Sequence, residues 1–246
     1  ISNDTLVGFS SYIWNRQFNL ELAKRVKQLN PNSIIVFGGP EMEILDYQFF
    51  EKYPFIDMHV VNEGEITFKT ILDNLDDWES IPNIIYNDGG KTKNTQAASR
   101  IMNLEQIPSP YLTGVFDDIL EKHPDYTFVA VFETNRGCPY QCTFCDWGSL
   151  TYSKIRKFPL ERVFSEIEWI YNTRRIDEIS IADSNFGIFV ERDEQIVDKF
   201  IEEYKRTKHK IEWQTAYAKN QNIAVAKMVK KLSDNTQAAN KIIISL

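Results

Sequence analysis

The sequence predicts a two-domain α/β protein. Predicted strands and helices alternate through both halves of the chain, and a polar, proline-containing stretch lies between the halves. The chain has 246 residues, enough for two ordinary domains, and 43% of them are hydrophobic, which suits buried cores. We therefore expect parallel sheets with helices on their faces.

The first half of the chain alternates strand with helix. Apolar, β-branched runs that end in glycine or polar turn residues predict strands, and apolar residues at helical spacing predict helices. The predicted strands cover residues 5–11, 33–37, 57–61 and 83–86. The predicted helices cover residues 17–29, about 46–52, and 67–75. These elements form a predicted Rossmann-like domain over residues 1–95.

The next stretch breaks this rhythm. From residue 91 the chain is polar, then contains Pro108 and Pro110, and ends in a short predicted helix near 115–122. This composition is typical of a segment between domains. We assign residues 96–127 to an inter-domain linker.

The alternation restarts in the second half. The predicted strands cover residues 128–133, 178–182, 210–215 and 241–245. The predicted helices cover residues 159–172, 193–207 and 223–232. Consecutive βα units of this kind predict the first part of a TIM-type (β/α)6 barrel over residues 128–246. Because predicted strands lie almost at both ends of the chain, we expect a fragment truncated at both ends.

Composition excludes some classes of function. The net charge is −7 and the pI is about 5.1, so a wide nucleic-acid-binding surface is not expected. No apolar run of membrane-spanning length and no signal segment is present. The chain has three cysteines, all within eight residues, a spacing too tight for a disulfide framework. Grouped, reduced thiols predict a metal or cluster site in the cytoplasm.

The cysteines are Cys138, Cys142 and Cys145, and they follow the first predicted strand of the second half. Loops at the carboxyl ends of barrel strands carry the chemistry of such folds. Thiolates are the ligands of iron–sulfur clusters, and three of them leave the fourth iron of a [4Fe–4S] cubane open to the amine and carboxylate of an amino acid. A structural zinc site, which requires a fourth ligand, and three inert buried thiols are the alternatives.

The stretch Glu133–Trp147, in one-letter code ETNRGCPYQCTFCDW, resembles the cysteine signature of radical S-adenosylmethionine (SAM) enzymes with an N-terminal cobalamin-binding domain. The resemblance implies that the reduced cluster cleaves SAM to methionine and a 5′-deoxyadenosyl radical, which abstracts a substrate hydrogen. It makes the three cysteines the cluster ligands and places Phe144 against the adenine of SAM.

The resemblance also implies SAM contacts after later barrel strands. The sequence IADSNF at 181–186 matches the acidic, Asn-Phe-ending pattern of the cobalamin subgroup, and points to Asp183 and Ser184. Turn or capping roles for these two residues are an equal alternative. Gln214, beside Trp213, and Ser245 occupy analogous positions. The stretch 215–219 lacks the arginine common in the family, which puts a carboxylate contact in doubt.

In the first half, the residues after the strands resemble cobalamin-binding domains. Ligands of open α/β sheets bind at the carboxyl ends of strands, where glycines allow close approach. The candidate cobalamin contacts are Ser10, Ser11, Trp14, Gly38, Gly39, Pro40, Glu41, Glu63, Gly64 and Glu65. No Asp-x-His-x-x-Gly motif is present, so cobalamin would bind without a histidine below cobalt. The alternative is a degenerate Rossmann-like domain with structural glycines.

The resulting hypothesis is a cobalamin-dependent radical SAM methyltransferase acting on an unactivated carbon or phosphorus centre. Its cofactors would be a [4Fe–4S] cluster, SAM and cobalamin. Its partners would be a small-molecule or peptide substrate and an electron donor such as a flavodoxin or ferredoxin. Alternatives are a cobalamin-dependent radical cyclase, rearrangement or oxidation enzyme, and a zinc- or cluster-stabilised binding protein. A methylthiotransferase would need further cysteines upstream of Cys138, and none is there.

Overall fold

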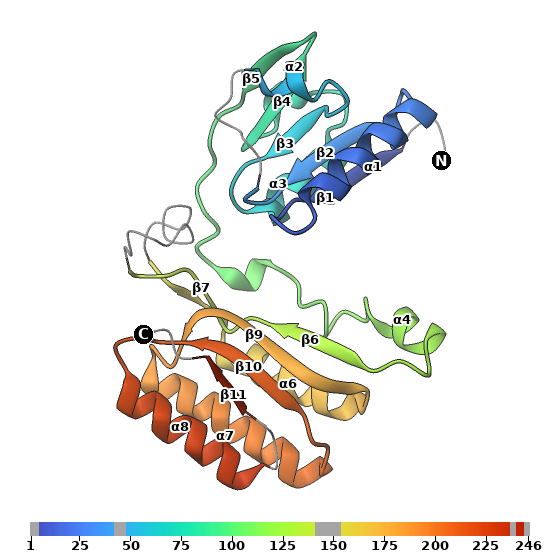
Figure 1. The fold of residues 1–246 in the computed structure, drawn as a ribbon. Helices are drawn as coiled ribbons and strands as arrows, with labels where there is room; N and C mark the ends of the chain where they lie inside the picture. Colours follow the sequence, from blue (N-terminus) through green and yellow to red (C-terminus); the bar gives the residue numbers. More distant parts are fainter. Residues whose placement is uncertain (1–4, 42–47, 141–153, 237–239, 244–246) are drawn as a thin grey trace. The chain divides into compact units, whose positions relative to one another are not determined.

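The computed structural model describes residues 5–41, 48–140, 154–236 and 240–243. The chain divides into two compact units, Ile1–Ile101 and Met102–Leu246 (Figure 1). The division falls within the segment that the sequence predicts as a linker. Among the described helices, none has both the length and the apolar character needed to cross a membrane.

A five-stranded sheet forms the centre of the first unit. The strands lie in sequence order: β1 (Leu6–Ser10), β2 (Ile34–Gly38), β3 (Met58–Val60), β4 (Ile84–Asp88) and β5 (Lys91–Asn94). The first three are parallel, so their carboxyl ends lie at one edge. The helices of this unit are α1 (Arg16–Leu29), α2 (Phe49–Lys52) and α3 (Gly64–Asp73), with a 3-10 turn at Trp78–Ser80.

Two apolar cores, one on each face of this sheet, hold the first unit together. On one face, Leu20 and Ala23 of α1 and the Phe49–Phe50 pair of α2 pack against Ile35 and Phe37 of β2. On the other face, Ile71 of α3 packs with Val36, Met58, Val60, Ile84 and Tyr86. Alternate β2 residues serve opposite cores, as the period of two in a strand requires. The unit is therefore the α/β sandwich that the sequence predicts.

The sheet is not wholly parallel, and in this respect the prediction was wrong. β3 and β4 pair antiparallel, and a hairpin through Gly89–Gly90 returns the chain as β5, antiparallel to β4. β5 has the sequence KTKN and lies mostly exposed at the edge of the sheet. An edge strand without an apolar face gives no hydrophobic period, so the sequence analysis missed it.

The second unit contains a four-stranded parallel sheet in the order β11-β10-β9-β6. These strands cover Phe128–Phe132 (β6), Ile176–Phe186 (β9), Glu212–Tyr217 (β10) and Asn240–Ile243 (β11). Three helices, α6 (Leu160–Thr173), α7 (Val190–Thr207) and α8 (Asn222–Asn235), cover one face (Figure 1). α4 (Asp117–Lys122) and a 3-10 turn at Leu104–Gln106 precede the sheet. Four βα-type strands match the predicted start of a barrel.

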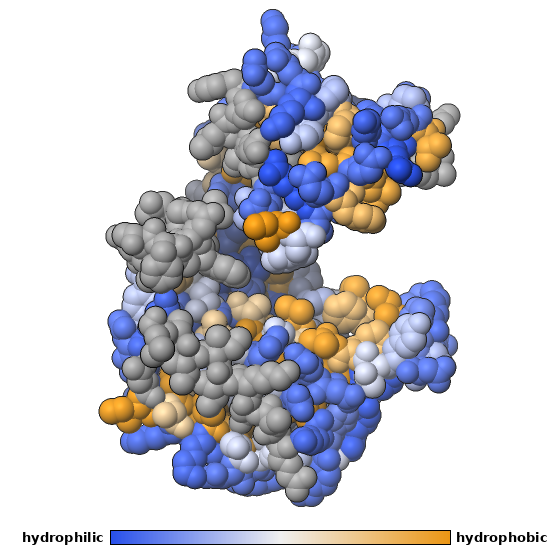
Figure 2. Space-filling view, in the orientation of Figure 1, coloured by the Kyte–Doolittle hydropathy of each residue, from blue (hydrophilic) through white to orange (hydrophobic). Residues whose placement is uncertain are grey.

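Among the described residues, the face of this sheet opposite the helices is left open along β6. Along β6, Ala130 and Phe132 are buried toward the helices, whereas Val129 and Val131 between them are 57% and 64% exposed. Figure 2 shows apolar surface gathered over the region of β6 and α4. In a closed barrel this face would be the interior.

In the second unit, one predicted boundary was wrong and one pair of strands was not predicted. β9 continues through Asp183, Ser184 and Asn185 to Phe186, which pairs with Tyr217, so these polar residues lie within the strand and not after it. The sequence also gave no indication of a short antiparallel pair, β7 (Asn135–Arg136) with β8 (Arg156–Lys157). This pair joins the two ends of the segment that contains the cysteines.

Gly39 marks the closest backbone approach in the first unit. Its φ is +104°, and a Cβ added there would lie 2.4 Å from the carbonyl oxygen of Ser11. Backbone atoms cannot yield as a flexible side chain can, so the end of β2 passes the end of β1 only if this residue has no side chain.

Gly39→Ala should therefore destabilise the protein by more than about 2 kcal/mol, because steric overlap adds to the conformational cost of a positive φ. Gly89→Ala is the matched control: φ there is +59°, and nothing lies within 4 Å of the added Cβ. The control should cost only about 1 kcal/mol. Urea unfolding followed by circular dichroism gives the free energy of unfolding of both variants. Equal losses of this free energy would contradict the steric overlap assigned to an added Cβ at Gly39.

Candidate functional site

The carboxyl ends of β1, β2 and β3 border a cavity of about 540 Å³ in the first unit. Five of the predicted cobalamin contacts line it: Ser10, Gly38, Gly39, Gly64 and Glu65. The cavity also extends over Gly8 in β1, where an added Cβ would lie 3.4 Å from the ring of Phe68. Strand-end glycines thus leave open space over the edge of the sheet, where the sequence analysis expected a ligand.

Ser11 lies beneath this edge. It is fully buried, its amide N–H donates to the carbonyl of Gly38 at 2.7 Å, and its hydroxyl oxygen has no hydrogen-bond partner among the described residues. A buried hydroxyl without a partner costs free energy. A ligand with polar groups at this edge of the sheet would relieve that cost.

The other candidates in this unit have different surroundings. Trp14 is 77% exposed, and its ring stacks on Tyr12, a residue of the cavity wall, with 4.7 Å between ring centroids. Glu63 pairs with Arg100 at 3.5 Å and accepts a hydrogen bond from the amide of Ile101. Pro40 is exposed and Glu41 half-buried, and neither lines the cavity. These four residues therefore surround the cavity without bordering it.

The candidate cluster site begins at the end of β6. Cys138 is half-buried, three residues past Asn135 of β7, and its Sγ accepts a hydrogen bond from Nδ2 of Asn185 at 3.2 Å. Cys142, Phe144, Cys145 and Ser245 lie outside the described residues. Within the described part, the structure thus brings the first cysteine of the motif against the carboxyl end of β9.

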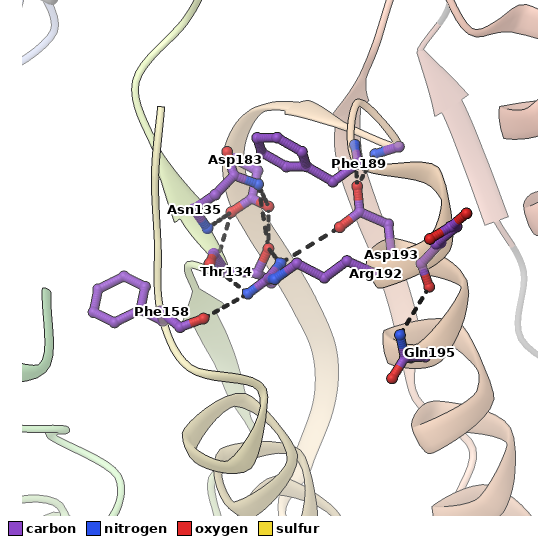
Figure 3. Close-up of polar contacts among 10 residues, drawn as sticks. Thr134, Asn135, Phe158, Asp183, Phe189, Arg192, Asp193 and Gln195 are labelled. Carbon is purple, nitrogen blue, oxygen red and sulfur yellow. Dashed lines mark hydrogen bonds and ion pairs between the residues drawn. The ribbon is translucent and has the colours of Figure 1, made fainter. Parts of the chain in front are cut away.

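Asp183 of β9 anchors the chain that leads into the cysteines (Figure 3). It is 2% exposed, and its carboxylate accepts hydrogen bonds from the amides of Thr134 and Asn135 at 2.7 and 3.1 Å. The Thr134 hydroxyl and Nδ2 of Asn135 donate to its other oxygen. All its described hydrogen bonds thus go to this pair, so Asp183 fixes the start of the cysteine segment.

Arg192 of α7 ties both ends of that segment together. Its Nη2 donates to the carbonyls of Thr134 at 3.0 Å and Phe158 at 2.8 Å, which precede and follow the cysteines. The amide of Phe158 also donates to the Thr134 carbonyl. Asp193, fully buried, accepts from the amides of Gly187 and Phe189 and lies 3.5 Å from Arg192. The link between β6, β9 and α7 is therefore made by buried polar groups (Figure 3).

Burial shapes the charges of this network. Burial raises the pKa of Asp183 to about 7, although the hydrogen bonds from Thr134 and Asn135 oppose that shift. Burial also raises the pKa of Asp193 and lowers the pKa of Arg192. In both carboxyl groups, hydrogen bonds from neighbouring donors favour the charged form and oppose the larger effect of burial.

Ser184 and Gln214 lie in a different environment from Asp183. Burial alternates along β9, with Ile179, Ile181 and Asp183 buried and Ser184 half-buried. In β10, Gln214 is half-buried between the buried Trp213 and Thr215. By strand alternation, Ser184 and Gln214 belong to the open face of the sheet and Asp183 to the face covered by helices.

Trp213, the neighbour of Gln214, has a packing role in the core. It is 5% exposed, and its ring stacks on Phe200 of α7 and meets the edge of Phe186.

Sequence reasoning missed Thr134, Asn135, Asn185, Arg192 and Asp193. The signal for the first three was their place beside recognised motifs: TN immediately precedes the RGC stretch, and Asn185 belongs to the IADSNF stretch. Nothing in the sequence alone singles out Arg192 or Asp193. The partners of Arg192 lie 34 and 58 residues away, and those of Asp193 are backbone groups of the nearby turn.

The fold and the two sites define the class of protein: a Rossmann-like α/β unit with a cavity at its strand ends, followed in the chain by a partial parallel barrel that carries a three-cysteine motif. Residues 3–72 match the family described as "B12 binding domain". The chain is 36% identical over 235 residues to the cobalamin-dependent radical SAM methyltransferase TokK of Streptomyces tokunonensis, covering 93% of the chain and 34% of that protein.

Two further similar proteins are also methyltransferases. The chain is 33% identical over 240 residues to the 2-(S-pantetheinyl)-carbapenam-3-carboxylate methyltransferase of Streptantibioticus cattleyicolor, covering 95% of the chain and 35% of that enzyme. Its fold matches that of the radical SAM methyltransferase TsrM from Kitasatospora setae, with a TM-score of 0.60 and 16% identity over 85% of the chain and 43% of TsrM.

The chain therefore belongs to the radical SAM enzyme family whose members carry a cobalamin-binding domain. It spans about a third of the length of the curated relatives it matches.

The raised pKa of Asp183 predicts a pH dependence of stability. Folded Asp183 keeps its proton to higher pH than the unfolded chain does, so its contribution to stability falls as pH rises from about 4 to about 7, by at most about 1.4 kcal/mol per pH unit. Asp183→Asn should flatten that part of the profile. Asp198→Asn, an exposed carboxylate on α7, should leave it unchanged. Urea unfolding of the cluster-free protein at several pH values measures both, and identical slopes in Asp183→Asn and the unmodified protein would refute the assignment.

Proposed function

We propose that this chain is the cofactor-binding part of a cobalamin-dependent radical SAM methyltransferase that acts on an unactivated carbon or phosphorus centre. The observation that carries the proposal is the three-cysteine motif after the first strand of a partial barrel, in a chain whose N-terminal unit matches a B12-binding family. The names of the related methyltransferases support the same activity.

Cys138, Cys142 and Cys145 would hold a [4Fe–4S] cluster and leave one iron for SAM. The surroundings of Cys138 fit this role. Its sulfur is half-buried and accepts an amide N–H, and electron-rich thiolates at a cluster are stabilised by such donors. The buried network around Asp183 and Arg192 holds both ends of the cysteine segment, so Asp183 would serve the cluster by fixing its loop.

Cobalamin would occupy the cavity at the carboxyl ends of β1–β3. The glycines of its wall allow a large ring system to approach the backbone, and the hydroxyl of buried Ser11 offers an unsatisfied polar group nearby. The remaining candidates, Trp14, Pro40, Glu41 and Glu63, would contribute from the surroundings of the cavity. His59, in the middle of β3, is 2% exposed, and its pKa is lowered to about 4 by burial, so it stays neutral in the core.

SAM would contact Ser184 and Gln214 on the open face of the second sheet, with Phe144 and Ser245 completing the site. Polar side chains on rigid strands orient a ligand without losing much conformational freedom. When bound, the cofactors supply the reductive cleavage of SAM and the transferable methyl group. A small-molecule or peptide substrate, a flavodoxin or ferredoxin as electron donor, and a cytoplasmic location complete the proposal.

Cys142→Ala tests the cluster assignment in the anaerobically purified full-length protein. The unmodified protein should contain about four irons and one cobalt per chain and form 5′-deoxyadenosine from SAM. In the variant, the cluster absorbance should disappear and the rate of 5′-deoxyadenosine formation should fall at least about a hundredfold, because a cubane held by two cysteines is not retained. It should still bind cobalamin.

Other results would select the alternatives. Zinc without iron or cobalt would indicate a metal-stabilised binding protein. Formation of 5′-deoxyadenosine without methyl transfer would indicate a radical cyclase, rearrangement or oxidation enzyme. Survival of 5′-deoxyadenosine formation in Cys142→Ala would refute the cluster role.

Gly38→Phe tests the cobalamin site and should remove cobalamin while the cluster is kept. Gly38 borders the cavity, its φ is not positive, and an added Cβ would make ordinary contact with Val60 at 3.8 Å. A phenyl ring would fit the backbone but occupy the part of the cavity beside β2, so bound cobalt should fall at least about tenfold while iron is retained. Gly38→Ala, which leaves the space open, should keep both metals. Full cobalt in Gly38→Phe would place cobalamin elsewhere.

A further inference from the structure

The contact between Asn185 and Cys138 joins two segments that are 47 residues apart in sequence. Nδ2 of Asn185 lies 3.2 Å from Sγ of Cys138. Asn185 is only 3% exposed, so water competes little for its amide group. An N–H donor directed at a cysteine sulfur stabilises negative charge on that sulfur.

Asn185 is held in position from its own strand. The next residue, Phe186, is fully buried between the rings of Trp213 and Tyr217. The carbonyl of Phe186 accepts the amide of Ala218 at 2.9 Å, and the carbonyl of Asn185 accepts the amide of Ile188 at 3.2 Å. The backbone around the donor is therefore fixed by packing and by hydrogen bonds that do not involve the cysteine segment.

The acceptor is fixed by contacts of the segment that precedes it. Asp183 binds Thr134 and Asn135, which end three residues before Cys138. Between them and the cysteine, Gly137 has a φ of +113°, and an added Cβ would lie 3.5 Å from the backbone of Lys154 and Ile155. Donor and acceptor are thus each held by contacts other than the hydrogen bond between them, so the contact does not depend on the cysteine segment alone.

We propose that Asn185 raises the reduction potential of the cluster by donating its side-chain N–H to the sulfur of Cys138. The inference rests on the proposed [4Fe–4S] site. One-electron reduction by the external donor adds a negative charge that spreads onto the cysteine sulfurs, and a hydrogen bond to a sulfur favours the more negative state. Asn185 is thus a positioning residue that makes the cluster easier to reduce.

Redox titration of the reconstituted full-length protein, followed by electron paramagnetic resonance, tests the proposal. In Asn185→Leu, which lacks a donor, the reduction equilibrium should become about tenfold less favourable, a fall of about 59 mV for a one-electron couple. Asn185→Asp keeps the shape but replaces the donor with a negative charge, so its potential should fall at least as far. Asn185→Gln keeps the amide and should lie closest to the unmodified protein.

Iron content separates the outcomes. Absence of iron from the unmodified protein would overturn the proposed function itself. Iron-loaded Asn185→Leu or Asn185→Asp with an unchanged potential would overturn only the role of Asn185. Loss of iron from Asn185→Asp while Asn185→Gln retains it would support the need for the N–H. Thr207→Val, which removes a buried hydroxyl and its two hydrogen bonds at the end of α7, controls for general destabilisation and should leave the potential unchanged.

Discussion

The buried carboxylate of Asp183 is the constraint on which the candidate cluster site depends. It accepts backbone and side-chain hydrogen bonds from Thr134 and Asn135, and Arg192 extends the same network to Phe158 on the far side of the cysteines. Buried charges are retained only when nearby donors and acceptors satisfy them. These contacts close the base of the cysteine segment on β9 and α7.

The first unit prepares its site by a different means. Here the constraint is the absence of side chains: Gly39 allows the end of β2 to pass against the carbonyl of Ser11, and its neighbours leave the edge of the sheet open. Both units use the carboxyl ends of parallel strands, where a rigid sheet supports a loop. In the second unit, buried polar contacts at that edge hold the start of the cysteine segment. In the first unit, the space above that edge is a cavity.

Sequence patterns predicted the elements and motifs that depend on local composition or on periodic spacing of apolar residues. Strands such as β2 and helices such as α7 follow from apolar spacing, and the cysteine motif follows from ligand chemistry. The pattern could not show that β9 continues through Asp183 to Phe186, because that depends on pairing with β10. It singled out Asp183 but not its partners. Arg192 is one arginine among many on amphipathic helices, and only tertiary packing brings it to Thr134 and Phe158.

The polar stretch at the end of β9 gains a physical meaning from strand geometry. Asp183 and Asn185 are both buried, while Ser184 between them is half-buried. Residues two apart on a strand lie about 7 Å apart on the same face. Along the facing segment, the partners of Asp183 are Thr134 and Asn135, and the partner of Asn185 is Cys138. One strand end thus holds the facing segment at two successive points, first through a carboxylate and then through an amide. Because the first contact fixes the backbone before the cysteine, the second can direct an N–H at the sulfur, while Ser184 remains free to face the open side of the sheet.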